Sequence, residues 1–223
     1  MSGPFDPAAS DLPAELPIFP LTGVLLLPRG RLPLNIFEPR YLAMTRNALG
    51  GARLIGMVQP SEPQDDGRGG GGLNPPVYPV GCAGRVTQFS ETDDGRYLIA
   101  LNGVARFQVV RELDMEEGYR RVEADFAPYR ADLEDGAAAA IDRERLIKAL
   151  KAYFTQESIS ADWDAIVEAP DDKLVTTLAM VCPFGNREKQ ALLESKGLTE
   201  RSQMMTALIE IAVLDNAGDA ARH

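Results

Sequence analysis

The chain has 223 residues, of which 45% are hydrophobic and 25% charged, the balance of an ordinary globular protein with room for one large domain or two small ones. Its formal net charge of −10 argues against general nucleic-acid binding, because such a surface repels phosphate backbones at long range. No apolar run exceeds five residues, far fewer than the roughly 20 residues of a membrane span, which argues against a membrane partner.

Residues 1–15 are predicted to form a flexible N-terminal arm, because they are small, acidic and proline-rich and show no periodicity. They also lack the basic and then apolar plan of a secretory signal, so we expect a cytoplasmic location.

The organised part of the chain begins with the stretch from Leu16 to Leu49. Prolines divide its apolar residues into pieces about one strand long, and proline in a sheet is confined to strand starts, edges and bulges. Pro39 suits the first turn of a helix, and the apolar residues after it recur at helical spacing. The stretch therefore predicts three short strands, the second at Val24 to Pro28, and then a helix.

Further short strands are predicted from Arg53 to Asp125, with the strand at Tyr97 to Leu101 buried on both faces and a turn around Glu116 to Gly118. Gly81 and Gly84 indicate a bulge or a close backbone approach, and the dipeptides Asp94-Gly95 and Asn102-Gly103 each predict a tight turn. The glycine-rich segment 60–76 is predicted to be a surface loop. The meander order, with one inserted helix, predicts a small, mostly antiparallel β-barrel over residues 16–129.

From Pro128 onward the apolar spacing becomes helical. It predicts a long helix that starts near Gly136, then several shorter helices, and thus a C-terminal helical bundle over residues 130–215 with a frayed tail at 216–223. The predicted fold class is α+β.

Several motifs resemble the N-terminal substrate-recognition domain of the ATP-dependent Lon (La) proteases, and especially bacterial proteins that consist of this domain alone. They are Leu16-Pro17-Ile18-Phe19-Pro20-Leu21, Val24 to Pro28, Leu32-Pro33-Leu34, Phe37-Glu38-Pro39-Arg40-Tyr41, Val80-Gly81-Cys82 and the hairpin with Gly103 and Arg106. The resemblance covers roughly residues 13–215 and implies a PUA-like barrel followed by a helical bundle. Full Lon proteases also carry an ATPase module and a Ser–Lys peptidase module, and the sequence shows neither.

Residues for catalysis or metal binding are sparse. The only histidine is His223, which argues against histidine-based triads and most zinc sites. Cys82 and Cys182 lie far apart without a CxxC motif, so we expect two buried free thiols. The sequence predicts no catalytic residue, no metal site and no cofactor.

The densest mixture of aromatic and charged residues runs from Phe37 to Tyr41. These residues fit two interpretations: a structural joint with the aromatic rings in the core, or a recognition patch with aromatic anchors and a guanidinium. The candidate binding residues are Phe37, Glu38, Arg40, Tyr41, Arg85 and Arg106.

Three hypotheses about function follow. The first is a non-catalytic module that binds unfolded or peptide-like protein segments, as an accessory or adaptor in proteolysis, with a protease or a chaperone as a further candidate partner. The second is RNA binding, because PUA-type folds bind RNA, although the acidic balance weighs against it. The third is a hydrolase with an unrecognised site.

Overall fold

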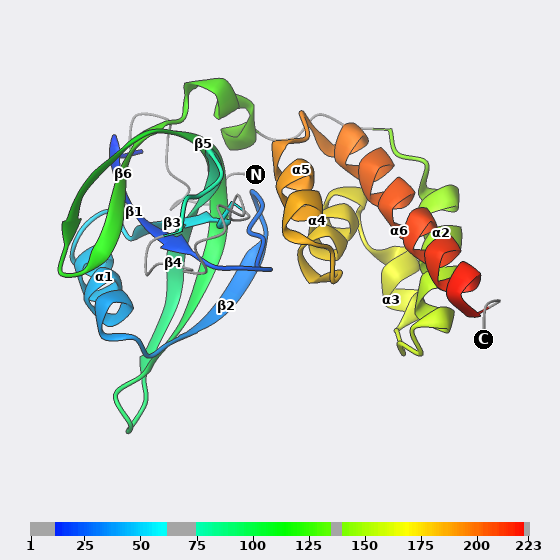
Figure 1. Cartoon of the computed structure of the whole chain (residues 1–223), viewed down its shortest axis with the longest axis horizontal. Coiled ribbons are helices and arrows are strands. Elements are labelled where there is room, and N and C mark those ends of the chain that lie inside the picture. Colours follow the sequence, from blue (N-terminus) through cyan, green and yellow to red (C-terminus); the bar gives the residue numbers. More distant parts are fainter. Residues whose placement is uncertain (1–11, 62–74, 135–139, 221–223) are drawn as a thin grey trace, which may run out of the picture. The chain divides into compact units, whose positions relative to one another are not determined.

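The structure is a computed structural model that describes residues 12–61, 75–134 and 140–220 (Figure 1). Its contacts group into two compact units. The sheet unit comprises the described residues up to 134 together with 183–193, and the helical unit comprises 140–182 and 194–220. Among the described residues, no helix is both long and apolar enough to cross a membrane.

The sheet unit is built on a six-stranded mixed sheet, which confirms the α+β class. Strand order is β2-β5-β4-β3-β1-β6, and β6 also pairs with β5. The pairings therefore close a circuit through β5, β4, β3, β1 and β6, while β2 is joined to β5 alone. All pairs are antiparallel except β1 with β3. The strands are β1 (Glu15–Pro20), β2 (Arg31–Ile36), β3 (Leu54–Val58), β4 (Val80–Glu91), β5 (Tyr97–Glu116) and β6 (Tyr119–Asp125).

The core of this unit surrounds the fully buried ring of Phe107 on β5. Leu16 and Val122 pack in the same cluster, so that three strands meet there. A Cβ atom on Gly81 would lie 2.6 Å from the Phe107 ring, which confirms the close approach predicted at this glycine. The ring and the glycine together let β4 and β5 pack tightly against the other strands.

Three helices accompany the sheet: α1 (Pro39–Gly50), the 3₁₀ helix η2 (Ala127–Leu133) and α5 (Asn186–Glu194). Pro39 occupies the first turn of α1, as predicted. Helix α5 lies within the range predicted for the helical subdomain, and its contacts group it with the sheet. Lys189 donates to the Gly23 carbonyl at 2.6 Å, and Gln190 donates to the Val80 carbonyl at 3.1 Å.

The strand predicted at Val24 to Pro28 is wrong. These residues form an irregular segment whose leucines, Leu25 to Leu27, are buried without joining the sheet. The segment turns sharply, because Gly30 donates to the Leu27 carbonyl and Arg29 takes a positive φ of 64°. Burial of three consecutive leucines thus reflects a loop packed into the core.

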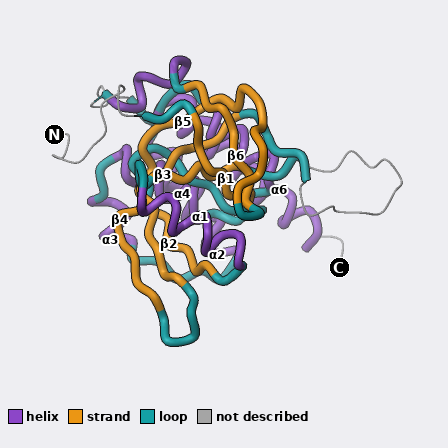
Figure 2. Tube along the Cα trace, turned by 90° about the vertical axis from the view of Figure 1, so that its left-hand side faces the viewer, coloured by secondary structure: helices purple, strands orange, loops and turns teal. Residues whose placement is uncertain are grey.

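The tight turn predicted at Asn102-Gly103 is also wrong, because β5 continues through both residues. The glycine is needed there for space. A Cβ atom on Gly103 would lie 1.9 Å from the Leu27 carbonyl oxygen. The predicted turns at residues 93–95 and 117–118 are confirmed. The first closes the long β4–β5 hairpin, whose end projects from the rest of the sheet (Figures 1 and 2).

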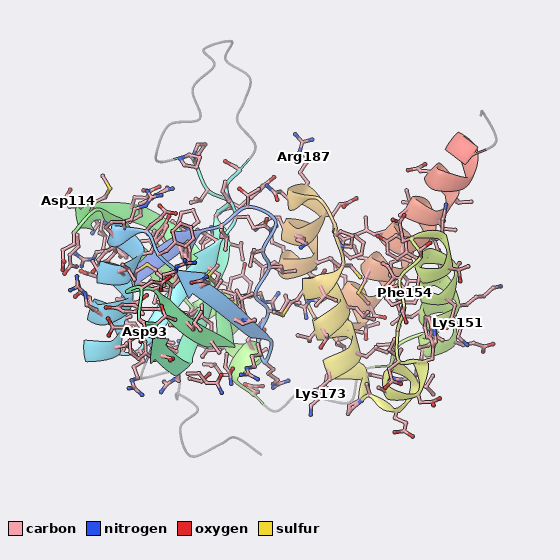
Figure 3. The ribbon with its side chains drawn as sticks, turned by 90° about the horizontal axis from the view of Figure 1, so that it is seen from below. Asp93, Asp114, Lys151, Phe154, Lys173 and Arg187 are labelled. Atoms are coloured by element: carbon pink, nitrogen blue, oxygen red, sulfur yellow. The ribbon has the colours of Figure 1, made fainter. Side chains whose placement is uncertain are left out.

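The helical unit contains α2 (Arg143–Gln156), α3 (Trp163–Glu168), α4 (Asp171–Val181) and α6 (Leu198–Ala220). Helix α2 begins at Arg143 and not near Gly136, because the Asp142 carboxylate caps it by accepting from the Arg145 amide. Phe154 on α2 is labelled in Figure 3. Its ring packs at a tilt against that of Trp163, with centroids 5.6 Å apart. Residues 62–74 of the predicted loop lie outside the described residues.

Candidate functional site

The residues from Phe37 to Tyr41 lie together where β2 ends and α1 begins. Tyr41 is buried, and its ring centroid lies 4.1 Å from that of Phe19. The Arg40 guanidinium stacks on the Tyr41 ring and pairs with Glu38 at 2.9 Å. Phe37, in contrast, is 63% exposed. Tyr41 thus lies in the core, as a structural joint requires, while Phe37 is exposed and its part in a recognition patch stays a prediction.

Burial raises the pKa of the Tyr41 hydroxyl above its ordinary value, and the nearby Arg40 charge offsets part of that rise. The Tyr41 hydroxyl is therefore neutral at physiological pH. The cluster offers a stacked guanidinium and an exposed phenyl ring, which are groups for contact and not for proton transfer.

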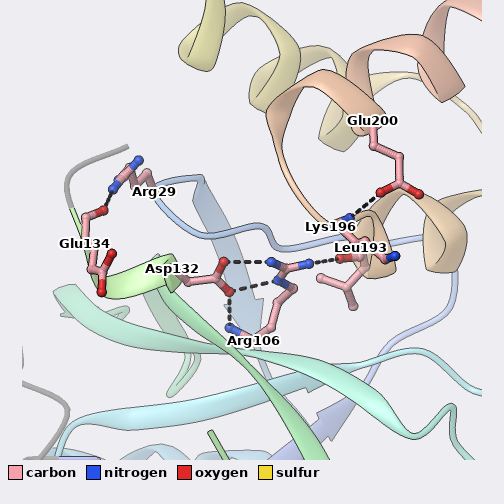
Figure 4. Close-up of polar contacts among 7 residues, drawn as sticks. All are labelled: Arg29, Arg106, Asp132, Glu134, Leu193, Lys196 and Glu200. Atoms are coloured by element: carbon pink, nitrogen blue, oxygen red, sulfur yellow. Dashed lines mark hydrogen bonds and ion pairs between the residues drawn. The ribbon is translucent and has the colours of Figure 1, made fainter. Parts of the chain in front are cut away.

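Arg106 lies apart from this cluster, in the interior of the sheet unit (Figure 4). Its guanidinium holds both carboxylate oxygens of Asp132 at 2.8 Å, and it also donates to the Leu193 carbonyl at 3.1 Å. Burial lowers the pKa of Arg106, but the hydrogen bonds and charge of Asp132 more than offset this and raise it above its ordinary value. Arg106 therefore ties β5 to η2 and α5, which is a structural task.

Arg85 lies on β4, where it is half-buried between Leu54 of β3 and Asn102 of β5. Its Nε atom is buried and makes no hydrogen bond with any residue that the structure describes. The predicted binding residues thus separate into one cluster at the start of α1 and two arginines within the sheet.

A groove of about 820 Å³ lies on the face of β2, β5 and β4, and the sequence does not indicate it. Leu98, which the alternating pattern predicted to be buried, is 46% exposed and lines it. Arg31 donates to the Gln88 side chain across the groove at 2.6 Å, and Thr87 donates to the Ala100 carbonyl at 3.2 Å. The walls thus combine amide and hydroxyl groups with a short apolar strip.

The charge of the groove differs from that of the chain as a whole. Among the described residues, Arg31 is the one charged member of its lining and no carboxylate takes part, although the chain carries 33 acidic residues. The part of the lining that the structure describes also holds no histidine, cysteine or lysine. Its two hydroxyl residues, Thr87 and Ser90, thus have none of these bases beside them in that part of the lining.

Strand β2 forms one side of this groove and is the edge of the sheet. Its residues pair one to one with β5, from Arg31 opposite Asn102 to Ile36 opposite Tyr97. An edge strand presents backbone donors and acceptors that can pair with another chain. Phe37 directly follows β2, so its exposed ring lies at the end of the strand that borders the groove.

The geometry defines an α+β domain with a groove beside an edge strand. Residues 15–210 match the family described as the ATP-dependent protease La (LON) substrate-binding domain. The chain belongs to this family, which confirms the resemblance found in the sequence.

Known proteins with similar sequences are Lon proteases of bacteria. The chain is 27% identical over 219 residues to the Lon protease of Anaeromyxobacter dehalogenans, covering 95% of this chain and 25% of that protein. It is 26% identical over 217 residues to Lon protease 2 of Myxococcus xanthus, covering 95% and 26%. The chain thus spans about a quarter of the length of these relatives.

Two solved structures share the fold. The Lon N-terminal domain protein from Xanthomonas campestris has a TM-score of 0.58 at 21% identity, with 86% of this chain and 97% of that one covered. The N-terminal domain of the Mycobacterium avium complex Lon protease has a TM-score of 0.59 at 17% identity, with 87% and 97% covered.

Proposed function

We propose that this chain is a polypeptide-binding module that recognises unfolded or peptide-like segments of other proteins and catalyses no reaction itself. Membership of the Lon substrate-binding family carries the proposal. The groove beside β2 supports it, because a concave surface with dispersed hydrogen-bonding groups and a short apolar strip suits an extended chain.

The proposed role is that of an accessory or adaptor in proteolysis, in the cytoplasm, with a protease or a chaperone as the cooperating protein. RNA binding has less support, because the groove holds one cation and a nucleic-acid channel needs many. Hydrolysis has less support as well, because the groove lacks an acid–base pair.

The proposal extends to the architecture. The closed circuit of strand pairings favours a small PUA-like barrel, with β2 joined outside the circuit. Arg145 of α2 forms two hydrogen bonds with Glu210 of α6, and Arg143 donates to the last carbonyls of α3, which favours a helical bundle. We retain 16–129 and 130–215 as the proposed subdomains, except that α5 is assigned to the first of them.

Leu98→Glu is expected to weaken the binding of an unfolded polypeptide about tenfold, because the exposed part of this leucine loses its apolar contact with the ligand. Fluorescence anisotropy with a labelled, permanently unfolded protein measures the affinity. The matched control is Met115→Glu, which places the same charge on the same strand at a residue 56% exposed, far along β5 from the groove.

Both variants are expected to keep the free energy of unfolding within about 0.5 kcal/mol, because both side chains are substantially exposed. Equal loss of binding in the two variants would show that added negative charge alone is responsible. Absence of binding by the unmodified chain would refute the proposed function.

A further inference from the structure

The edge strand β2 contains a proline, and this fixes which of its backbone groups face outward. Pro33 has no N–H to donate, and proline in a sheet lies where its nitrogen faces away from the partner strand. Among the described residues β2 has one partner, β5, so the Pro33 nitrogen faces the open edge.

The neighbouring hydrogen bonds agree with this assignment. Gly103 donates to the Gly30 carbonyl at 2.8 Å, so the residue one position before the paired register turns its carbonyl toward β5. Bonded and non-bonded pairs alternate along an antiparallel ladder. Residues 32, 34 and 36 are therefore bonded to β5, while Arg31 and Asn35 present both N–H and C=O to the open edge.

The same three residues, Arg31, Pro33 and Asn35, line the groove with their side chains. A strand added along β2 would place every second side chain beside them, on the face of the sheet that carries the groove. The residue opposite Pro33 would meet apolar surface. The residue opposite Arg31 would meet the one charge of the groove, so a carboxylate is favoured there.

A second copy of this chain is a poor occupant of the edge. Antiparallel pairing of two β2 strands centred on Pro33 would set two prolines opposite each other, and both of their hydrogen bonds would be missing. Centred on Arg31, the pairing would set two like charges opposite each other. Self-pairing is therefore disfavoured in these two registers, and the charge of Arg31 favours a different polypeptide that carries a carboxylate.

We propose that the chain binds its polypeptide ligand by strand addition to the open edge of β2, and that Arg31 selects segments with an acidic residue two positions from an apolar one. The proposal rests on the proposed function and specifies how the ligand is held. The Arg31 and Asn35 amides donate to the ligand backbone, and the carbonyls of Arg31, Pro33 and Asn35 accept from it.

Asn35→Pro tests this directly, because it removes an outward N–H and leaves the pairing with β5 in place, as Pro33 already does two residues earlier. The matched control is Asn35→Ala, which removes the same side chain and keeps the N–H. The probe is a labelled, blocked peptide of alternating valine and threonine with one central glutamate, followed by fluorescence anisotropy. A second probe carries lysine in place of glutamate.

Asn35→Pro is expected to weaken binding about tenfold or more, because a ligand carbonyl is left unpaired, while Asn35→Ala changes it less than about twofold. The lysine peptide is expected to bind the unmodified chain about threefold more weakly than the glutamate peptide. Equal affinities of the two Asn35 variants would overturn strand addition, and equal affinities of the two peptides would overturn the selection by Arg31.

Amide hydrogen exchange of the unmodified chain gives a readout that needs no variant. Without peptide, the amides of residues 32 and 34 should exchange slowly and those of 31 and 35 fast, and peptide should slow 31 and 35. Fast exchange at 31 and 35 with peptide bound would overturn the inference. A dimer that Asn35→Pro dissociates would also overturn it, by assigning the edge to a second copy.

Strand addition to β2 and polypeptide binding in general are refuted by different results. If an unfolded protein binds but neither Asn35 variant affects it, strand addition is wrong and the polypeptide-binding function stands. If no polypeptide binds the unmodified chain at all, both are wrong.

Discussion

Asp132→Ala is expected to lower the free energy of unfolding by about 3–5 kcal/mol, because it leaves a buried guanidinium without its counter-charge. The side chains of Arg106 and Asp132 are only 6% and 10% exposed. The carboxylate accepts from the guanidinium at two atoms and from the Arg106 backbone amide at 3.0 Å. Removing the carboxylate takes the acceptor from the Arg106 backbone amide and guanidinium, and it leaves the guanidinium charge in the interior without its counter-charge.

The measurement is equilibrium unfolding in urea, followed by the fluorescence or circular dichroism of the chain. Glu123→Ala is the matched control, because it breaks an Arg–carboxylate pair on the same sheet whose side chains are 65% and 40% exposed. That exposed pair is expected to contribute less than about 1 kcal/mol. Similar losses in the two variants would contradict the structural task assigned to Arg106.

Gly103→Ala is expected to lower the free energy of unfolding by about 3 kcal/mol. The new Cβ atom would lie 1.9 Å from the Leu27 carbonyl oxygen and 2.8 Å from the Leu27 carbonyl carbon. Both are backbone atoms of a segment that hydrogen bonds at residues 29 and 30 hold against β5, so they cannot move aside without breaking those bonds. Urea unfolding measures this loss as well.

Gly50→Ala serves as the control for glycine replacement. Gly50 ends α1 and has nothing within 4 Å of the position of a new Cβ atom. Alanine there is expected to change the free energy of unfolding by less than about 1 kcal/mol. A stable Gly103→Ala variant would show that β5 and the 27–30 segment are not packed as described.

Local patterns in the sequence predicted much of the fold. Proline and helical spacing identified α1, and the alternation of apolar residues identified the strands that the sheet pairs. Asn102-Gly103 misled because the same dipeptide serves a tight turn and a close backbone approach. Only the position of Leu27, a residue distant in sequence, distinguishes the two.

The site was less predictable than the fold. The sequence indicated Phe37 to Tyr41 as a mixed cluster, and local chemistry could not show that Tyr41 is buried and Phe37 exposed. The groove was missed because alternating apolar residues in β5 predicted burial on both faces. Whether a face is covered depends on the order of strands in the sheet. Pro33 was the one local signal of an edge strand.

Polypeptide binding at β2 and the groove is tested most directly by titrating the isotope-labelled chain with an unfolded polypeptide and following amide chemical shifts by nuclear magnetic resonance. Saturable shifts concentrated in residues 31–37, 87–90 and 98–100 are predicted, with residues near Met115 unchanged. The absence of saturable shifts would contradict polypeptide binding, and shifts confined to residues outside β2 and the groove would contradict this binding surface.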